Sequence, residues 1–171
     1  MPRGLKPNSS QITVSFGVTE SAANTFTQSE IDLALNVLDR EVFVVTAIDL
    51  DPLPPDADFG ASTRVNASLS TTSRASVGTL SGSNVLAVKN LYIRTAAGGT
   101  AAGAVFMTGS TESPPTQMEY LGIIATNNFY VQVEGDGNGN AKSVSGKLYG
   151  YRAIADGDTF AALTQSELLS A

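Results

Sequence analysis

The sequence predicts an all-β fold, a β-sandwich of about eight strands with a short C-terminal helix. Apolar and polar residues alternate along most of the chain, which is the period of a strand with one buried face. Helical periodicity occurs only once, near the C-terminus. At 171 residues, of which 42% are hydrophobic and 15% are charged, the chain can bury one core. We therefore expect an extended N-terminal arm at residues 1–10 and a single domain at residues 11–171.

Three strands are expected in the N-terminal third of the chain. Residues 11–18 ("QITVSFGV") alternate cleanly, residues 26–35 place Ile31, Leu33 and Leu35 on one face, and residues 41–50 are rich in β-branched side chains. "NVLDRE" between the last two indicates a turn or a short helical turn. The prolines of "DPLPPDADFGAS" cannot continue a central strand, so this segment is expected to be a surface loop.

The remaining strands are expected after this loop. "TRVNASLSTTS" places Val65, Ala67 and Leu69 on one side, residues 85–94 predict a strand or a strand pair, and residues 105–107 predict a short strand. "MEYLGIIAT", "NFYVQVEG" and "KSVSGKLYGYRAIAD" complete the series.

The helix is expected at residues 158–170, where Asp156 or Asp158 can cap "TFAALTQSELLS". Its approximate apolar stripe consists of Phe160, Leu163, Leu168 and Leu169. Two leucines exposed at the end of a monomer would be unfavourable. We therefore expect Leu168 and Leu169 to contact a neighbouring subunit, unless they close the sandwich itself.

Composition excludes several kinds of chemistry. Cysteine, histidine and tryptophan are all absent. Without Cys there is no thiol nucleophile or disulfide, and without His the commonest general base is missing. A net charge of −6 opposes binding to nucleic acid. No apolar run is long enough to span a bilayer and no signal-peptide core is present, so a soluble chain is expected. Because Cys and His are absent, no enzymatic activity is expected.

The stretch "VEGDGNGNAKSVSG" (residues 133–146) resembles both a calcium loop and a phosphate loop. Asp136, Asn138 and Asn140 match the first three calcium ligands, but Ala141 and Lys147 stand where the required Gly and Glu belong. The phosphate-loop pattern requires a glycine at the position that Asp136 occupies. Asp-Gly and Asn-Gly between two alternating segments instead favour the tip of a β-hairpin, with an adventitious weak cation site as the alternative.

A second acidic group begins at Asp49 and Asp51, which share one face of a strand, and continues with Asp56 and Asp58 in the following loop. Such carboxylates can bind Ca²⁺ or act in pairs in glycoside hydrolysis. A solvated strand end is the favoured interpretation. No cofactor and no metal are expected, and the weak cation candidates are Asp49, Asp51, Asp136 and Asn138.

Tyr149 and Tyr151 lie two residues apart and are expected on one strand face. Two exposed rings could form a platform for a sugar, although packing in the core or between subunits is favoured.

In style and architecture, the chain resembles a single jelly-roll viral capsid protein or another virion structural protein. The segments "FTQSEIDLALNVLDREVFVVTAIDLD" and "GKLYGYRAIADGDTFAALTQSELLS" carry this resemblance. It implies two four-stranded sheets packed face to face, location in the virion, and partners that are copies of the chain and other coat proteins. The chain departs from many capsid proteins in lacking a strongly basic arm, so direct contact with the genome is not expected.

Two other classes of function remain open from the sequence. A carbohydrate-binding β-sandwich module would also be all-β, acidic and rich in loops. A tail-tube, fibre or surface-filament subunit would assemble with a different symmetry. The alternative to a location in the virion is an extracellular or cell-surface one.

Overall fold

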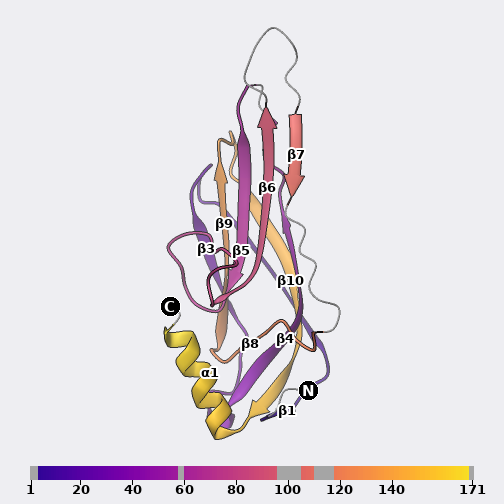
Figure 1. Ribbon diagram of the computed structural model, residues 1–171, viewed down its shortest axis with the longest axis vertical. Coiled ribbons are helices and arrows are strands. Elements are labelled where there is room, and N and C mark those ends of the chain that lie inside the picture. The colour runs from indigo at the N-terminus through magenta and orange to yellow at the C-terminus, as the bar shows by residue number, and fades with distance from the viewer. Residues whose placement is uncertain (1–3, 58–59, 96–104, 110–117, 170–171) are drawn as a thin grey trace.

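A computed structural model describes residues 4–57, 60–95, 105–109 and 118–169. These residues form an elongated sandwich of two antiparallel sheets with one helix at the C-terminal end (Figure 1). The predicted all-β class is confirmed. Within the described residues, no helix has the length and apolarity that a membrane crossing requires.

The first sheet is built around the longest strand, β10. Its members are β1 (Leu5–Pro7), β2 (Ile12–Thr19), β4 (Glu41–Pro52), β8 (Gly122–Ile124) and β10 (Ser143–Ala155). On one side, β10 pairs with β2 along its first half and with β1 along its last residues, and on the other side it pairs with β4. β8 pairs with the far side of β4 and ends the sheet.

The second sheet has the order β3-β9-β5-β6-β7. Its strands are β3 (Thr27–Asp32), β5 (Thr63–Ser70), β6 (Val85–Thr95), β7 (Val105–Gly109) and β9 (Asn128–Asp136). Without β1 and β7, the strand orders of the two sheets are β2-β10-β4-β8 and β3-β9-β5-β6. The chain changes sheets at most of its connections, and this gives the predicted jelly-roll-like sandwich, in ten described strands rather than about eight.

The main core lies between the two sheets. Val65, Ala67 and Leu69 of β5 are fully buried, as are alternate residues of β9, so both period-two predictions are confirmed. Phe16 of β2 meets Phe129 of β9 edge to face, with ring centroids 5.6 Å apart. The sheets are thus held together by interdigitating side chains from alternate positions.

A second, smaller core covers the outer face of the first sheet. Val42 and Val44 of β4 contribute to it, whereas Phe43 and Val45 belong to the main core. β4 is therefore buried on both faces at this end, which explains its continuous apolar run. Figure 1 shows α1 (Gly157–Leu169) at the same end of the molecule as β1.

Part of the N-terminal arm, which the sequence predicts to be separate from the domain at residues 11–171, joins the first sheet and the second core. Leu5, Lys6 and Pro7 pair with the end of β10, and the side chain of Leu5 is buried in the second core. The segment is polar in composition, but a single leucine and three residues of extended backbone are enough to extend the edge of a sheet. A lone apolar residue gives no periodicity from which this strand could be predicted.

The helix begins as predicted, with Asp156 rather than Asp158 as its cap. The Asp156 carboxylate accepts a hydrogen bond from the backbone N–H of Thr159 (2.8 Å), and hydrogen bonds from Thr159 hold the pKa of Asp156 below its usual value. Phe160 and Leu163 pack on the second core, while Glu167 occupies the next position on the inner side.

One predicted connection is confirmed, and a second is confirmed in part. Val37–Asp39 form a 3-10 turn between β3 and β4. The proline-containing loop begins later than predicted, because Asp51 and Pro52 still pair with β10 as the end of β4. The described residues beyond them, 53–57 and 60–62, form no strand. Residues 58–59 of that loop, and residues 96–104 and 110–117, lie outside the described residues.

Candidate functional site

The acidic residues that the sequence singled out do not form one site. Asp49 and Asp51 lie on the exposed face of β4. The Tyr149 hydroxyl donates a hydrogen bond to Asp49 (3.2 Å), and the pKa of Tyr149 is raised by its burial and by Asp49. Asp136 forms an exposed ion pair with Arg64 (3.1 Å). Across the described ranges, no group of three or more His, Cys, Asp or Glu side chains is placed to hold a metal ion.

The segment 137–142 is not the tip of a β-hairpin. β9 lies between β3 and β5 in one sheet, and β10 lies between β2 and β4 in the other. Both edges of each strand are occupied, so β9 and β10 cannot pair, and the loop crosses between the sheets. Gly137 does take a positive φ of 73°. The turn prediction is therefore confirmed for Asp-Gly but not for Asn-Gly, since Gly139 has no positive φ, and the predicted pairing was wrong.

Asn138 anchors this crossing loop and is almost fully buried. Its side-chain amide donates to the carbonyl of Arg64 (2.8 Å), and its side-chain oxygen accepts from the N–H of Asp56 (2.9 Å). Its backbone N–H and C=O both bond to the side chain of Asn24 (2.8 Å each). Because these polar groups bind protein atoms, Asn138 acts as a structural link in this corner.

Two further buried groups fix the same corner. The Glu20 carboxylate accepts the N–H groups of Gly135 and Lys142 (2.6 Å each). The Lys142 ammonium group pairs with Asp56, and that hydrogen bond holds the pKa of Asp56 below its usual value. Asp56 also accepts the N–H of Gly139 (2.9 Å). The corner is thus a satisfied network that ties three loops together.

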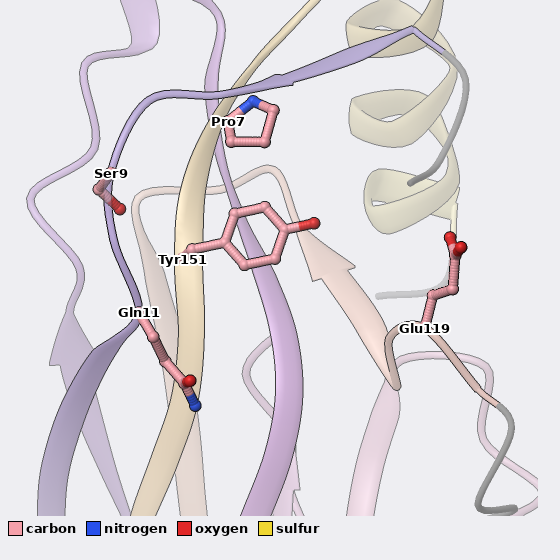
Figure 2. A pocket seen from close by; sticks show the side chains of 5 residues that line it. All are labelled: Pro7, Ser9, Gln11, Glu119 and Tyr151. Atoms are coloured by element: carbon pink, nitrogen blue, oxygen red, sulfur yellow. The ribbon is translucent and has the colours of Figure 1, made fainter.

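A surface cavity of about 470 Å³ offers a different kind of site. Figure 2 shows the Tyr151 ring close to the Pro7 ring, with the Tyr151 hydroxyl directed towards the side of Glu119. Ser9 and Gln11 line the opposite end. The lining therefore combines two apolar rings with an amide, a hydroxyl and a carboxylate.

Only tertiary structure brings this lining together. Tyr151 comes from β10, Pro7 from β1, Ser9 and Gln11 from the link before β2, and Glu119 from the segment before β8. The Ser9 hydroxyl is already engaged, since it donates to the carbonyl of Ser10 (2.8 Å) and accepts the N–H of Arg152 (2.9 Å). Of the predicted aromatic pair, Tyr151 lines the cavity, and Tyr149 bonds to Asp49 instead.

The end of α1 presents the third candidate feature. Leu168 and Leu169 are 69% and 78% exposed, so they do not close the sandwich. Beside them, Glu167 is buried and accepts the N–H groups of Ala125 and Thr126 at the β8–β9 turn (3.0 Å each). This double hydrogen bond fixes the rotation of the last helical turn, and the two leucines are thereby held towards solvent.

No protein-family model, no curated protein sequence and no solved structure matches this chain.

Proposed function

We propose that this protein is a non-catalytic structural subunit that assembles with copies of itself, and that the assembly is a virion shell. The observation that carries the proposal is the pair Leu168 and Leu169, held in solvent by the anchored Glu167. Burying each leucine would contribute about 1.5–3 kcal/mol. A neighbouring subunit can supply that burial.

The fold is compatible with this role. Jelly rolls of two packed sheets are common in viral capsid proteins, and also in lectin domains. Fold alone does not define function, so the exposed leucines, and not the topology, are the basis of the proposal. Other coat proteins are further candidate partners.

The direct test is size-exclusion chromatography with light scattering, followed by electron microscopy of the purified chain. Closed shells support the virion proposal, whereas filaments support a tail-tube, fibre or surface-filament subunit. The variant with both Leu168→Ser and Leu169→Ser should assemble less while keeping its melting temperature. Leu38→Ser is the matched control, because Leu38 is 95% exposed on another part of the molecule. A parent chain that stays monomeric at all concentrations would refute the proposal.

Carbohydrate binding is the second candidate function, and the Tyr151 cavity favours it. A sugar ring can stack on an aromatic face while its hydroxyls bond to amide and carboxylate groups, and the cavity provides both kinds of surface. Glycan-array screening tests this function. Binding that is lost in Tyr151→Ala and kept in Tyr149→Ala would support it, and an array without any hit would refute it.

A further inference from the structure

The outer edge of β2 is open. β10 pairs with β2 along one side from Ile12 to Thr19, and within the described ranges no other strand pairs with the opposite side. At the end of this ladder, the Lys142 carbonyl accepts the N–H of Glu20, whereas the Ser143 carbonyl accepts the N–H of Leu53, the residue after β4. By alternation, even-numbered residues of β2 bond to β10. The backbone groups of its odd-numbered residues therefore point away from the sheet.

Five other strands with an open edge are short or charged at that edge. β1 and β8 have three residues each, and β7 has five. β3 carries Glu30 and Asp32. The part of β4 beyond β8 carries Asp49 and Asp51, and the Lys89 ammonium group donates to the Leu50 carbonyl there (2.9 Å). Short length and charge are the usual protections against pairing between molecules.

β2 has none of these protections. Its eight residues, "ITVSFGVT", contain no charge and no proline. The side chains of Ile12, Val14 and Val18 pack against the main core but remain partly exposed at this edge. The edge thus combines unpaired backbone groups with apolar side chains that the monomer covers incompletely.

We infer that β2 pairs antiparallel with β2 of a second copy, so that the first sheets of two subunits become continuous. This inference rests on the proposed assembly function and names one of its contacts. Only same-parity residues can exchange bonds across an antiparallel pair. The register with Phe16 at the two-fold axis is the one that bonds all four odd-numbered residues of β2. Thr13 then bonds with the partner's Thr19, and Ser15 with the partner's Gly17.

The sequence of β2 suits pairing with itself in this register. Val14 faces the partner's Val18 on the core side, which covers two of the partly exposed side chains. The outer side pairs threonine with threonine and serine with glycine, without a charge or a bulky side chain. With four residue pairs bonded, the ladder contains about eight hydrogen bonds. A strand bearing acids, such as β3, would instead bring uncompensated charge to this edge.

Sedimentation velocity of two matched variants tests the contact. Ser15→Glu adds a charge at the open edge, where the two copies of residue 15 lie diagonally across the pair. We expect its dimer dissociation constant to rise at least about tenfold, because like charges brought together at an interface are costly. Ala47→Glu adds the same charge on an exposed residue of β4 within the same sheet, and should dimerise like the parent.

Disulfide trapping tests the register, since the chain has no natural cysteine. The double variant Ser15→Cys with Gly17→Cys places each thiol opposite one on the partner and should give a covalent dimer on a non-reducing gel. Either single variant places its thiol opposite a residue without sulfur and should stay monomeric on the gel.

The outcomes separate this inference from the proposed function. Loss of dimer in Ser15→Glu together with trapping in the double cysteine variant supports the β2 contact. Assembly of Ser15→Glu equal to that of the parent, with no trapping, overturns the contact and leaves the assembly function in place. A parent chain that is monomeric at every concentration overturns both.

Discussion

Gly146 of β10 lies directly beneath the ring of Phe16 on the neighbouring strand β2. A Cβ atom at position 146 would stand 2.6 Å from that ring and 2.2 Å from the Asp49 carbonyl oxygen. Gly146→Ala should therefore lower the free energy of unfolding by about 1–3 kcal/mol, the usual cost of overpacking. Urea denaturation measures this change.

Gly17 provides the matched control for that prediction. It also lies in the first sheet, but a Cβ atom there would come no closer than 3.4 Å to a neighbouring atom. Gly17→Ala should leave the midpoint of urea denaturation close to that of the parent. Equal destabilisation by the two variants would show that the loss of glycine, and not the space beneath Phe16, decides the effect.

Asp136 and Asn138 lie two residues apart in the crossing loop but should respond differently to substitution. Asp136 is exposed, and its ion pair with Arg64 is an exposed one that contributes little, so Asp136→Asn should change stability by about 0.5 kcal/mol or less. Asn138→Ala leaves several buried partners without a hydrogen bond and should cost about 2 kcal/mol or more. Thermal unfolding in the same buffer compares the two variants.

Calcium should not shift either melting temperature, because the Asn138 oxygen is already occupied by the N–H of Asp56. A rise of the parent's melting temperature with added Ca²⁺ that Asp136→Asn abolishes would contradict this prediction and restore the cation-site interpretation.

Glu167 should make stability depend on pH in a defined direction. Burial raises the pKa of its carboxyl above the usual value of 4.5, against the hydrogen bonds from Ala125 and Thr126. The folded chain therefore binds this proton more tightly than the unfolded chain, and the stability linked to Glu167 declines as the pH rises from 4.5 through the raised pKa. The unfolding free energy of the parent minus that of Glu167→Gln should accordingly be larger at pH 4 than at pH 7. A difference that grows with pH would contradict the assigned burial.

The N-terminal arm should stabilise the monomer itself. Leu5 is buried in the second core, and the Asn8 side chain donates to Glu41 (3.1 Å). Leu5→Ala should lower the free energy of unfolding by about 2–3 kcal/mol, and deletion of residues 1–10 should lower it further. Lys6→Ala, an exposed position on the same strand, is the control. Unchanged denaturation midpoints after the deletion would mean that the arm contributes only to contacts between subunits.

Local patterns predicted most of the elements. Alternation located β2, β5 and β9, β-branched residues located β4, and turn residues located the 3-10 turn after β3. The helix was located by its spacing, but its inner stripe was assigned in part to Leu168 and Leu169, where the structure buries Glu167. A glutamate at that position carries no apolar signal, and its partners lie at a turn more than forty residues away in sequence.

The candidate sites were less predictable. Tyr151 was named from the sequence, but Pro7, Gln11 and Glu119 were not, because they come from separate segments and none has a distinctive motif. Asp49, Asp51 and Asp136 were named together as cation candidates, and the structure places Asp49 beside a tyrosine and Asp136 beside an arginine.

The sequence by itself determined that this chain is a β-sandwich with one terminal helix, because side-chain alternation, proline and glycine act on neighbouring residues. Tertiary structure alone decided which strands pair. β9 and β10 follow one another through an Asp-Gly turn, yet they belong to different sheets, because each has both edges occupied by strands from distant parts of the chain. The open edge of β2 and the exposed leucines of α1 are likewise what remains after those long-range pairings are made.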